Sequence, residues 1–154
     1  MRRKDREMKN IEDIIETMKK CEVCRLAING DNGYPYIIPL NFGLDIADGK
    51  IKIIFHSAME GKKIELFTSD NRASFKMDYA HEIEYSEERG YCTSHFESVI
   101  GRGKIRILAD SEKEGALNRL MSQYHPEGTY YNKAAIPRTL VYCLDVESIT
   151  GKIK

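Results

Sequence analysis

The stretch that decides the fold spans residues 34–63 and reads YPYIIPLNFGLDIADGKIKIIFHSAMEGKK. Its first part, 34–42, is rich in residues that favour strands, and the dipeptide Asp48-Gly49 then marks a turn. A second strand is expected over 50–56, where apolar residues dominate. The preceding segment 21–29 is also strand-like and meets 34–42 across the turn cluster 30–33. Three successive antiparallel strands are therefore predicted.

Three helices are predicted beside these strands. Apolar residues at 11, 14, 15 and 18 share one helical face, so a helix is expected over 10–20 with Asn10 as its N-cap. Two Ser-x-x-Glu capping boxes mark the other helix starts, because the serine oxygen accepts a backbone N–H while the glutamate reaches back. The first box opens a helix to about Phe67, and the second opens a helix whose apolar face reaches Tyr124; the boxes are Ser57 with Glu60 and Ser111 with Glu114.

The second half of the chain adds strands at 73–79, 97–109 and 140–149. Between the first two, the acidic residues from Glu82 to Glu88 show little periodicity, and a loop is expected there. Over 97–109, apolar and glycine residues alternate with polar ones, which predicts a long strand with one side facing solvent or a ligand. Strands and helices do not alternate one to one. The sequence therefore predicts a mainly β fold with flanking helices, a six-stranded antiparallel barrel, rather than a parallel sheet.

Composition limits the classes of function. The chain has 154 residues, enough for one domain, so 1–154 is expected to be a single unit. Its 24 basic and 24 acidic residues give no net charge, which argues against nucleic acid as a partner. No apolar run reaches the ~18 residues of a membrane span, and no leader-like apolar segment follows the basic start, so a cytoplasmic protein with no membrane partner is expected. The four cysteines are expected to be reduced thiols.

The strand that ends at His56 leads into a predicted helix start, and such a start favours an anion because its N–H groups and dipole are positive. Gly61 allows close approach to the backbone, and Lys62 and Lys63 supply charge. A phosphate site is one interpretation. The alternative is an ordinary capped helix with two solvated lysines and a histidine bonded to backbone or water.

Five motifs together resemble one known superfamily across essentially the whole chain: the basic N-terminal MRRKDRE, the hairpin GYPYIIPLNF, FHSAMEGKK, ESVIGRGK and the terminal ITGK. They are similar to the flavin-binding split-barrel proteins related to pyridoxamine 5′-phosphate oxidase, and most similar to the nitroimidazole-resistance (Nim-type) reductases. The resemblance implies a six-stranded split barrel that forms a homodimer and binds FMN, less often FAD, at the dimer interface. The chain lacks the oxidase's arginine-rich substrate residues and C-terminal signature, so pyridoxamine phosphate is not expected as substrate.

Matched position by position, the resemblance also implies a set of site residues. Leu40 and Asn41 would lie beside the flavin ring, and Lys62 with Lys63 would hold its phosphate. Ser98 would meet the cofactor from the long strand. The edge of the ring and the ribityl chain would be lined by Phe55, His56 and Ser57. His56 is the expected catalytic residue, as a hydrogen-bond or proton donor, in a reductase that passes electrons from NAD(P)H to a small electron-poor acceptor such as a nitro-aromatic.

Other patterns leave alternatives open. The same fold could hold a flavin or haem as a binding or sensor protein without turnover. Cys21-x-x-Cys24 and Cys92-x-x-His95 could form a zinc site in an interaction domain, but residues three apart on a strand point to opposite faces, so unpaired thiols and no metal are expected. A basic stripe could attract a nucleotide tail or lie in solvent; it comprises Arg102, Lys104 and Arg106. The aromatic loop from Tyr124 to Tyr131 could cover the flavin or close the barrel.

Overall fold

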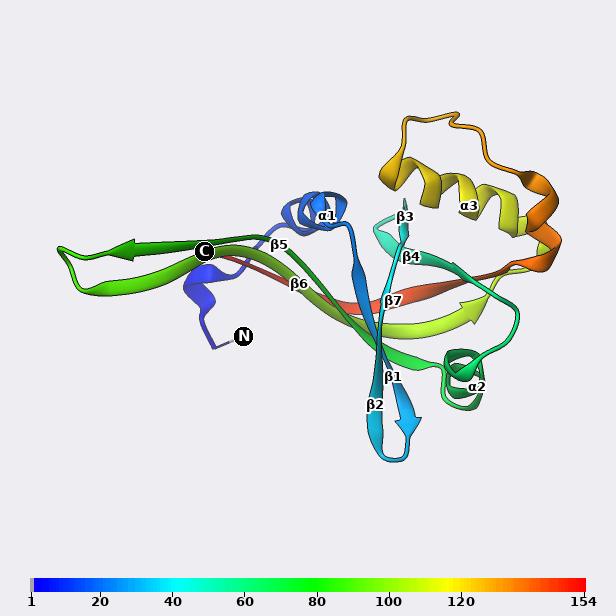
Figure 1. Ribbon diagram of the computed structural model, residues 1–154, viewed down its shortest axis with the longest axis horizontal. Coiled ribbons are helices and arrows are strands. Elements are labelled where there is room, and N and C mark those ends of the chain that lie inside the picture. Colours follow the sequence, from blue (N-terminus) through cyan, green and yellow to red (C-terminus); the bar gives the residue numbers. More distant parts are fainter. Residues whose placement is uncertain (1) are drawn as a thin grey trace.

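The computed structural model, which describes residues 2–154, is built around one antiparallel sheet of seven strands (Figure 1). The strands are β1 (Cys24–Asp31), β2 (Tyr34–Leu40), β3 (Gly43–Ala47), β4 (Lys50–Ser57), β5 (Arg72–Ser86), β6 (Tyr91–Ile107) and β7 (Leu140–Ile153). The α helices are α1 (Ile11–Lys20), α2 (Lys62–Ser69) and α3 (Asp110–Tyr124). Two short 3-10 helices are η1 (Lys4–Arg6) and η2 (Lys133–Arg138). The mainly β fold with flanking helices is confirmed.

The sheet order is β2-β1-β5-β6-β7-β4-β3. Its inward side chains form the main apolar core, in which Leu26, Phe55, Phe75 and Tyr142 are at most 2% exposed. The two end strands, β2 and β3, share no ladder within the described residues, so the predicted barrel is not closed, and we use the word barrel for this open sheet around its core. The predicted antiparallel pairing is confirmed, whereas the predicted strand count of six is wrong.

The seventh strand arises because segment 34–42 is not one strand. The chain turns at Asn41 and Phe42, so that β2 pairs with β1 while β3 pairs with β4. Phe42 is fully buried and its N–H donates to the Tyr124 hydroxyl oxygen at 2.9 Å. Gly43 follows because a Cβ there would come within 2.6 Å of the Leu120 backbone. Helix α3 therefore fixes the break, and residues so distant in sequence are not visible as a local pattern.

The helix starts differ from the predicted capping boxes. The N-terminal helix is confirmed, but the Asn10 side chain donates to Asp13 instead of capping. Ser57 lies in β4 and bonds the Ala58 carbonyl, and α2 starts only after Gly61. The second predicted box is also wrong. Helix α3 starts at Asp110, and the carboxylate that accepts the Ala109 N–H is that of Glu112, while Glu114 pairs with Lys133.

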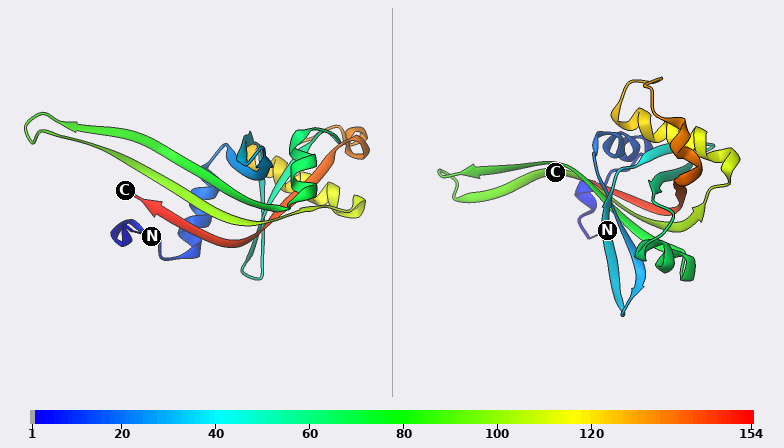
Figure 2. Two further views of the ribbon diagram at one scale, coloured as in Figure 1. Left: turned by 90° about the horizontal axis from the view of Figure 1, so that it is seen from below. Right: turned by 45° about the vertical axis from the view of Figure 1, so that its right-hand side comes forward.

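The acidic segment predicted as a loop is strand. Strands β5 and β6 run on past the barrel, paired from Glu82 with His95 to Ser86 with Tyr91, and form a long two-stranded ribbon. Figure 2 shows this ribbon, residues 80–96, extending well beyond the rest of the molecule. We call it the arm. A register shift between Tyr79 and Glu82, where Ala80 has a φ of 48°, marks its root.

The helices cover different parts of the sheet (Figure 1). Helix α3 packs on the outer side of β3, β4 and β7, where a second apolar cluster includes Ile54, Ala116 and Val141. Helix α2 lies against β1, and α1 lies against β5 and β6 near the root of the arm. Within residues 2–154, none of the helices is both long and apolar enough to cross a membrane.

Candidate functional site

The candidate site lies where β4 ends and α2 begins. Strand β4 places alternate residues on opposite faces, so Phe55 points into the barrel and His56 points outward on the face of Ile54. Phe55 is fully buried, with its ring centroid 5.5 Å from that of Tyr142. The Phe55 side chain therefore belongs to the core, and only the backbone of Phe55 is left to line a site. His56 is therefore the side chain that this end of the strand presents outward.

His56 borders a mainly apolar pocket of about 310 Å³, which lies between the end of β4, helix α3 and the segment that follows α3 in the chain. The other lining residues are Leu117, Leu120, Met121, Tyr131, Asn132, Ala135, Ile136 and Thr139. Partial burial, and then the positive charge of Lys63, lower the pKa of His56 below its ordinary value of 6.5. The lowered pKa favours the neutral imidazole, which brings one N–H donor and one acceptor to a pocket lined mainly by apolar side chains.

The two lysines at the start of α2 differ. Gly61 precedes the helix with a φ of 134°, a conformation open to glycine, and its carbonyl accepts the N–H groups of Ile64 and Glu65. Lys62 turns to the β1–β2 hairpin, where its Nζ lies 2.6 Å from the Asp31 carboxylate and over the Tyr36 ring. The Asp31 hydrogen bond raises the pKa of Lys62. Lys63, in contrast, has its charge close enough to act on His56.

The remaining predicted residues fall into two places. Leu40 packs against the core at the end of β2, and Asn41 is exposed. Asn41 lies beyond the end of the β3–β4 ladder where Gly43 pairs with Ile54, which is also the His56 end. Ser98 is elsewhere. It pairs with Lys152 on β7, whereas His56 pairs with Val141 on the same strand.

The separation between Ser98 and His56 is large within one chain. Their β7 partners are eleven residues apart, which corresponds to ~36 Å along a straight strand at ~3.3 Å per residue. Ser98 lies on the outer face at the root of the arm, because the neighbouring Val99 points inward. The register thus places Asn41 at the same end of the β3–β4 ladder as His56 and Ser57, which lead toward α2, and leaves Ser98 apart from them.

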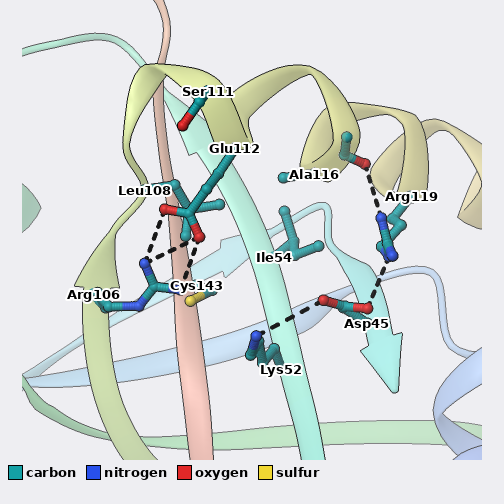
Figure 3. A pocket seen from close by; sticks show the side chains of 11 residues that line it. Asp45, Lys52, Ile54, Arg106, Leu108, Ser111, Glu112, Ala116, Arg119 and Cys143 are labelled. Atoms are coloured by element: carbon teal, nitrogen blue, oxygen red, sulfur yellow. Dashed lines mark hydrogen bonds and ion pairs between the residues drawn. The ribbon is translucent and has the colours of Figure 1, made fainter. Parts of the chain in front are cut away.

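A second cavity, of about 230 Å³, lies under the first half of α3 (Figure 3). It is rich in charge, but the cations are paired: Arg119 lies 2.8 Å from Asp45, and Arg106 lies 3.1 Å from Glu112. Cys143 lies at its floor, where burial raises the pKa of the thiol to about 11. The thiol is protonated at pH 7 and is no nucleophile. No residue of the predicted set lines this cavity.

The two cysteine-containing pairs do not meet. Cys21 and Cys24 are buried where α1 leads into β1, and burial raises the pKa of the Cys21 thiol to about 11. Cys92 and His95 lie on the arm. Among residues 2–154, no group of three or more His, Cys, Asp or Glu side chains is placed to hold a metal ion.

Sequence reasoning missed most of the wall around His56. The face of α3 carrying Leu117, Leu120 and Met121 was visible as a helical stripe, but its contact with β4 was not. The wall formed by η2 gave no local signal, because Ala135, Ile136 and Thr139 form no regular pattern. Tyr131, at the end of the aromatic loop, lines the pocket, and its hydroxyl donates to Asn118 on α3 at 2.9 Å.

Comparisons with known proteins agree on the family. A family model described as pyridoxamine 5′-phosphate oxidase matches residues 10–153. A candidate 5-nitroimidazole antibiotic resistance protein from Bacteroides thetaiotaomicron superposes with a TM-score of 0.82 at 26% identity, over 96% of this chain and 86% of its own. None of the curated proteins matches this chain significantly.

Two further solved structures share the fold at lower identity. The FAD and haem binding protein from Mycobacterium smegmatis has a TM-score of 0.81 at 16% identity, over 97% of this chain and 73% of its own. A flavocytochrome from Azotobacter vinelandii has a TM-score of 0.80 at 13% identity, over 100% of this chain and 72% of its own.

Proposed function

Because this chain belongs to the pyridoxamine 5′-phosphate oxidase family, we propose that it is a flavin-dependent oxidoreductase. It takes electrons from NAD(P)H and passes them to a small electron-poor acceptor such as a nitro-aromatic. FMN is the proposed cofactor, with FAD as the alternative. The observation that carries the proposal is the junction of β4 and α2, where His56, with its lowered pKa, borders a mainly apolar pocket and the helix start carries Lys63.

The residues present fit a flavin phosphate. Helix α2 offers N–H groups of its first turn that have no intrahelical acceptor, and Gly61 leaves open space where a Cβ would otherwise stand. Lys63 is the proposed cationic partner of the phosphate. Lys62 is a weaker candidate, because binding a phosphate would require it to leave Asp31. The Ser57 hydroxyl, whose present acceptor is the adjacent Ala58 carbonyl, is available to the ribityl chain.

A bound flavin supplies the hydride acceptance and electron transfer that no side chain here provides. The protein's own part is to orient the acceptor and to exclude water from the site. The apolar walls of the His56 pocket favour an uncharged, flat acceptor. The neutral imidazole donates one hydrogen bond to charge that develops on such an acceptor, and with its pKa lowered it acts at pH 7 as a hydrogen-bond donor rather than as an imidazolium acid.

We further propose that the working unit is a homodimer. A single chain leaves Ser98 far from His56, so a site using both residues needs two chains. A small barrel also offers too little concave surface to enclose a flavin ring, and a second copy supplies the missing wall. The site residues from the two chains would then meet at the interface.

The absorption spectrum of the purified protein tests this function. Flavin bands are expected, and chromatography of the released cofactor identifies FMN or FAD. Anaerobic addition of NADH or NADPH should bleach the bands, and a nitro-aromatic should restore them. Bands that persist with either donor would instead identify a flavin-binding protein without this turnover. A Soret band alone would identify a haem protein, and the absence of any flavin after reconstitution with FMN or FAD would overturn the proposal.

A further inference from the structure

The cavity under the first half of α3 is separate from the His56 pocket, although the same helix covers both. Lys52, Ile54 and His56 follow one another along the outer face of β4, and the cavity lies at the Lys52 end. The two share none of their lining residues. At about 230 Å³ the cavity is below the ~300–1,000 Å³ of pockets for drug-sized ligands, so it suits a smaller molecule.

The floor of this cavity is apolar. Its floor residues are Ile54, Leu108, Ala116 and Cys143, each at most 7% exposed, and all four belong to the second apolar cluster. The protonated thiol of Cys143 adds no charge to this floor. A ligand that reaches it must therefore carry an apolar group.

The rim of the cavity is charged, and one of its ion pairs is fully engaged. Arg106 donates to both carboxylate oxygens of Glu112 at 3.1–3.3 Å, and Glu112 Oε2 also accepts the Ala109 N–H at 2.9 Å. Figure 3 shows this pair on one side of Ile54 and the Asp45 carboxylate on the other. The Arg106–Glu112 pair therefore offers a ligand little.

Lys52 and Asp45 are less completely bonded. Lys52 Nζ lies 4.0 Å from Asp45 Oδ2, which is too far for a hydrogen bond, and Lys52 donates no hydrogen bond to any of residues 2–154. The other oxygen, Asp45 Oδ1, lies 2.8 Å from Arg119 Nε. The Lys52 and Asp45 side chains are only 39% and 24% exposed. The rim thus places an ammonium in need of an acceptor beside a carboxylate oxygen in need of a donor.

The balance of charge selects the kind of ligand. Asp145 lies 3.7 Å from Arg106 Nε, so the three cations around the cavity, Lys52, Arg106 and Arg119, face three carboxylates. An anion bound at Lys52 would be repelled by Asp45, and a cation bound at Asp45 would be repelled by Lys52. A molecule with adjacent positive and negative groups and no net charge satisfies both side chains at once.

We propose that this cavity binds an α-amino acid with an apolar side chain. The ligand's carboxylate accepts from Lys52, its ammonium donates to Asp45 Oδ2, and its side chain packs on the floor at Ile54 and Ala116. Such charge-assisted hydrogen bonds are the stronger class. The site needs neither the flavin nor His56, so it is a binding function beyond the proposed reductase and stands or falls separately from it.

Isothermal titration calorimetry on the purified protein tests the site, with L-valine, L-leucine, L-phenylalanine and glycine as probes. The best apolar amino acid is then compared with the same molecule lacking its amino group and with the same molecule lacking its carboxylate. The test variant is Lys52→Gln. The matched control is Lys50→Gln, because Lys50 lies on the same face of the same strand, is exposed, and does not line the cavity.

We expect at least one apolar amino acid to bind one per chain with a dissociation constant below about 1 mM. Glycine and both analogues should bind at least about tenfold more weakly, because each lacks one of the three contacts. Lys52→Gln should weaken binding at least about tenfold and Lys50→Gln less than about twofold.

Three results would overturn the inference. The first is that none of the apolar amino acids binds at about 10 mM. The second is an analogue or glycine that binds as tightly as the apolar amino acid, which would assign the cavity to a simple acid, to an amine or to charge alone. The third is equal affinity in Lys52→Gln and wild type, which would place the bound amino acid elsewhere on the protein. The analogue comparison uses the unaltered chain, so it decides the matter even where a variant folds poorly.

Discussion

The two halves of strand β6 differ in which side is apolar. In the barrel half, Val99 and Ile105 point inward to the core and the basic residues point outward. In the arm half, the inward side carries Thr93 and His95, while the apolar residues of the ribbon gather on the outward side. One continuous strand thus reverses its apolar side where β7 ends. The apolar side of the barrel half packs on the core, whereas the apolar side of the arm half is exposed.

The largest expected effect is a loss of stability from a substitution in the barrel half of β6. A Cβ on Gly103 would collide with the Asp145 carbonyl of β7, so Gly103→Ala should force the two strands apart. We expect a loss of at least ~3 kcal/mol in the free energy of unfolding, measured by urea denaturation. Ser94→Ala on the arm is the control and should change it by less than ~0.5 kcal/mol. Equal losses of stability at both positions would contradict the difference drawn between the barrel half and the arm half of β6.

The next effect concerns His56 and separates a loss of turnover from a loss of flavin binding. His56→Ala should lower turnover of a nitro-aromatic by ~10²-fold with flavin affinity nearly unchanged, because the imidazole donates where charge develops on the acceptor. The control is His95→Ala on the arm, which should keep wild-type turnover. Since the pKa of His56 is lowered, the change of the wild-type rate with pH should be centred below the pH expected for an ordinary imidazole. Steady-state kinetics across pH 5–8 measure both.

Two results would reassign His56. Unchanged turnover in His56→Ala would make it a residue of the pocket rim only. Loss of flavin as the sole defect would move it from the reaction to cofactor binding. Either outcome would leave the contrast between the two halves of β6 intact, because His56 lies on β4.

The barrel half was predictable from sequence because its alternation is local. Over 99–105, each inward residue is apolar or glycine, and β6 follows directly from that pattern. The acidic part of the arm, from Glu82 to Glu88, was predicted as a loop because the strands of the arm are held by each other and not by a core. Only Ile83 and Tyr85 mark the apolar side on β5, and the glutamates around them mask the period. A two-stranded ribbon that packs on no core leaves little hydrophobic signal in the sequence.

The site was predictable to the same extent. Alternation along β4 was enough to place His56 on the face of Lys52 and Ile54, and to make a ligand-facing strand end plausible. Local pattern did not show that Lys62 would pair with Asp31, since that ion pair depends on where the β1–β2 hairpin packs. Local pattern also did not show that Ser98 lies far from His56, because this distance depends on which β7 residues the two pair with.

A smaller effect distinguishes the two lysines of α2. Replacing both by Ala should weaken flavin binding by ~tenfold or more, as charge-assisted bonds to the phosphate are lost. Lys63→Ala should account for most of this, while Lys62→Ala should weaken binding by less than about threefold because Lys62 is engaged with Asp31. Fluorescence titration of the apoprotein with FMN measures each constant. The reverse order of effects would place the phosphate on the hairpin side of α2, and an unaffected double variant would remove it from this helix.

The smallest effect concerns Glu97, which lies at the point where the barrel half becomes the arm. Its carboxylate accepts the Thr17 hydroxyl at 2.6 Å and lies 2.9 Å from Lys20 Nζ, so it ties the arm's root to α1. These hydrogen bonds, that of Thr17 first, lower the pKa of Glu97 below its ordinary value of 4.5 despite partial burial. A carboxyl whose pKa is lowered by folding adds stability above its unfolded pKa, and that stability is lost as pH falls through the folded value.

Glu97→Gln should therefore lower Tm by about 2–4 °C at pH 7. The difference from wild type should shrink as the pH falls below 4.5, because the wild-type carboxyl then becomes neutral too. Glu82→Gln, on the arm beyond the root, is the control and should leave Tm unchanged at both pH values. Thermal unfolding followed by circular dichroism at pH 7 and pH 3.5 tests this. A difference that persists undiminished at pH 3.5 would mean that Glu97 acts through its shape rather than its charge, and the root of the arm would then be held by packing of α1 alone.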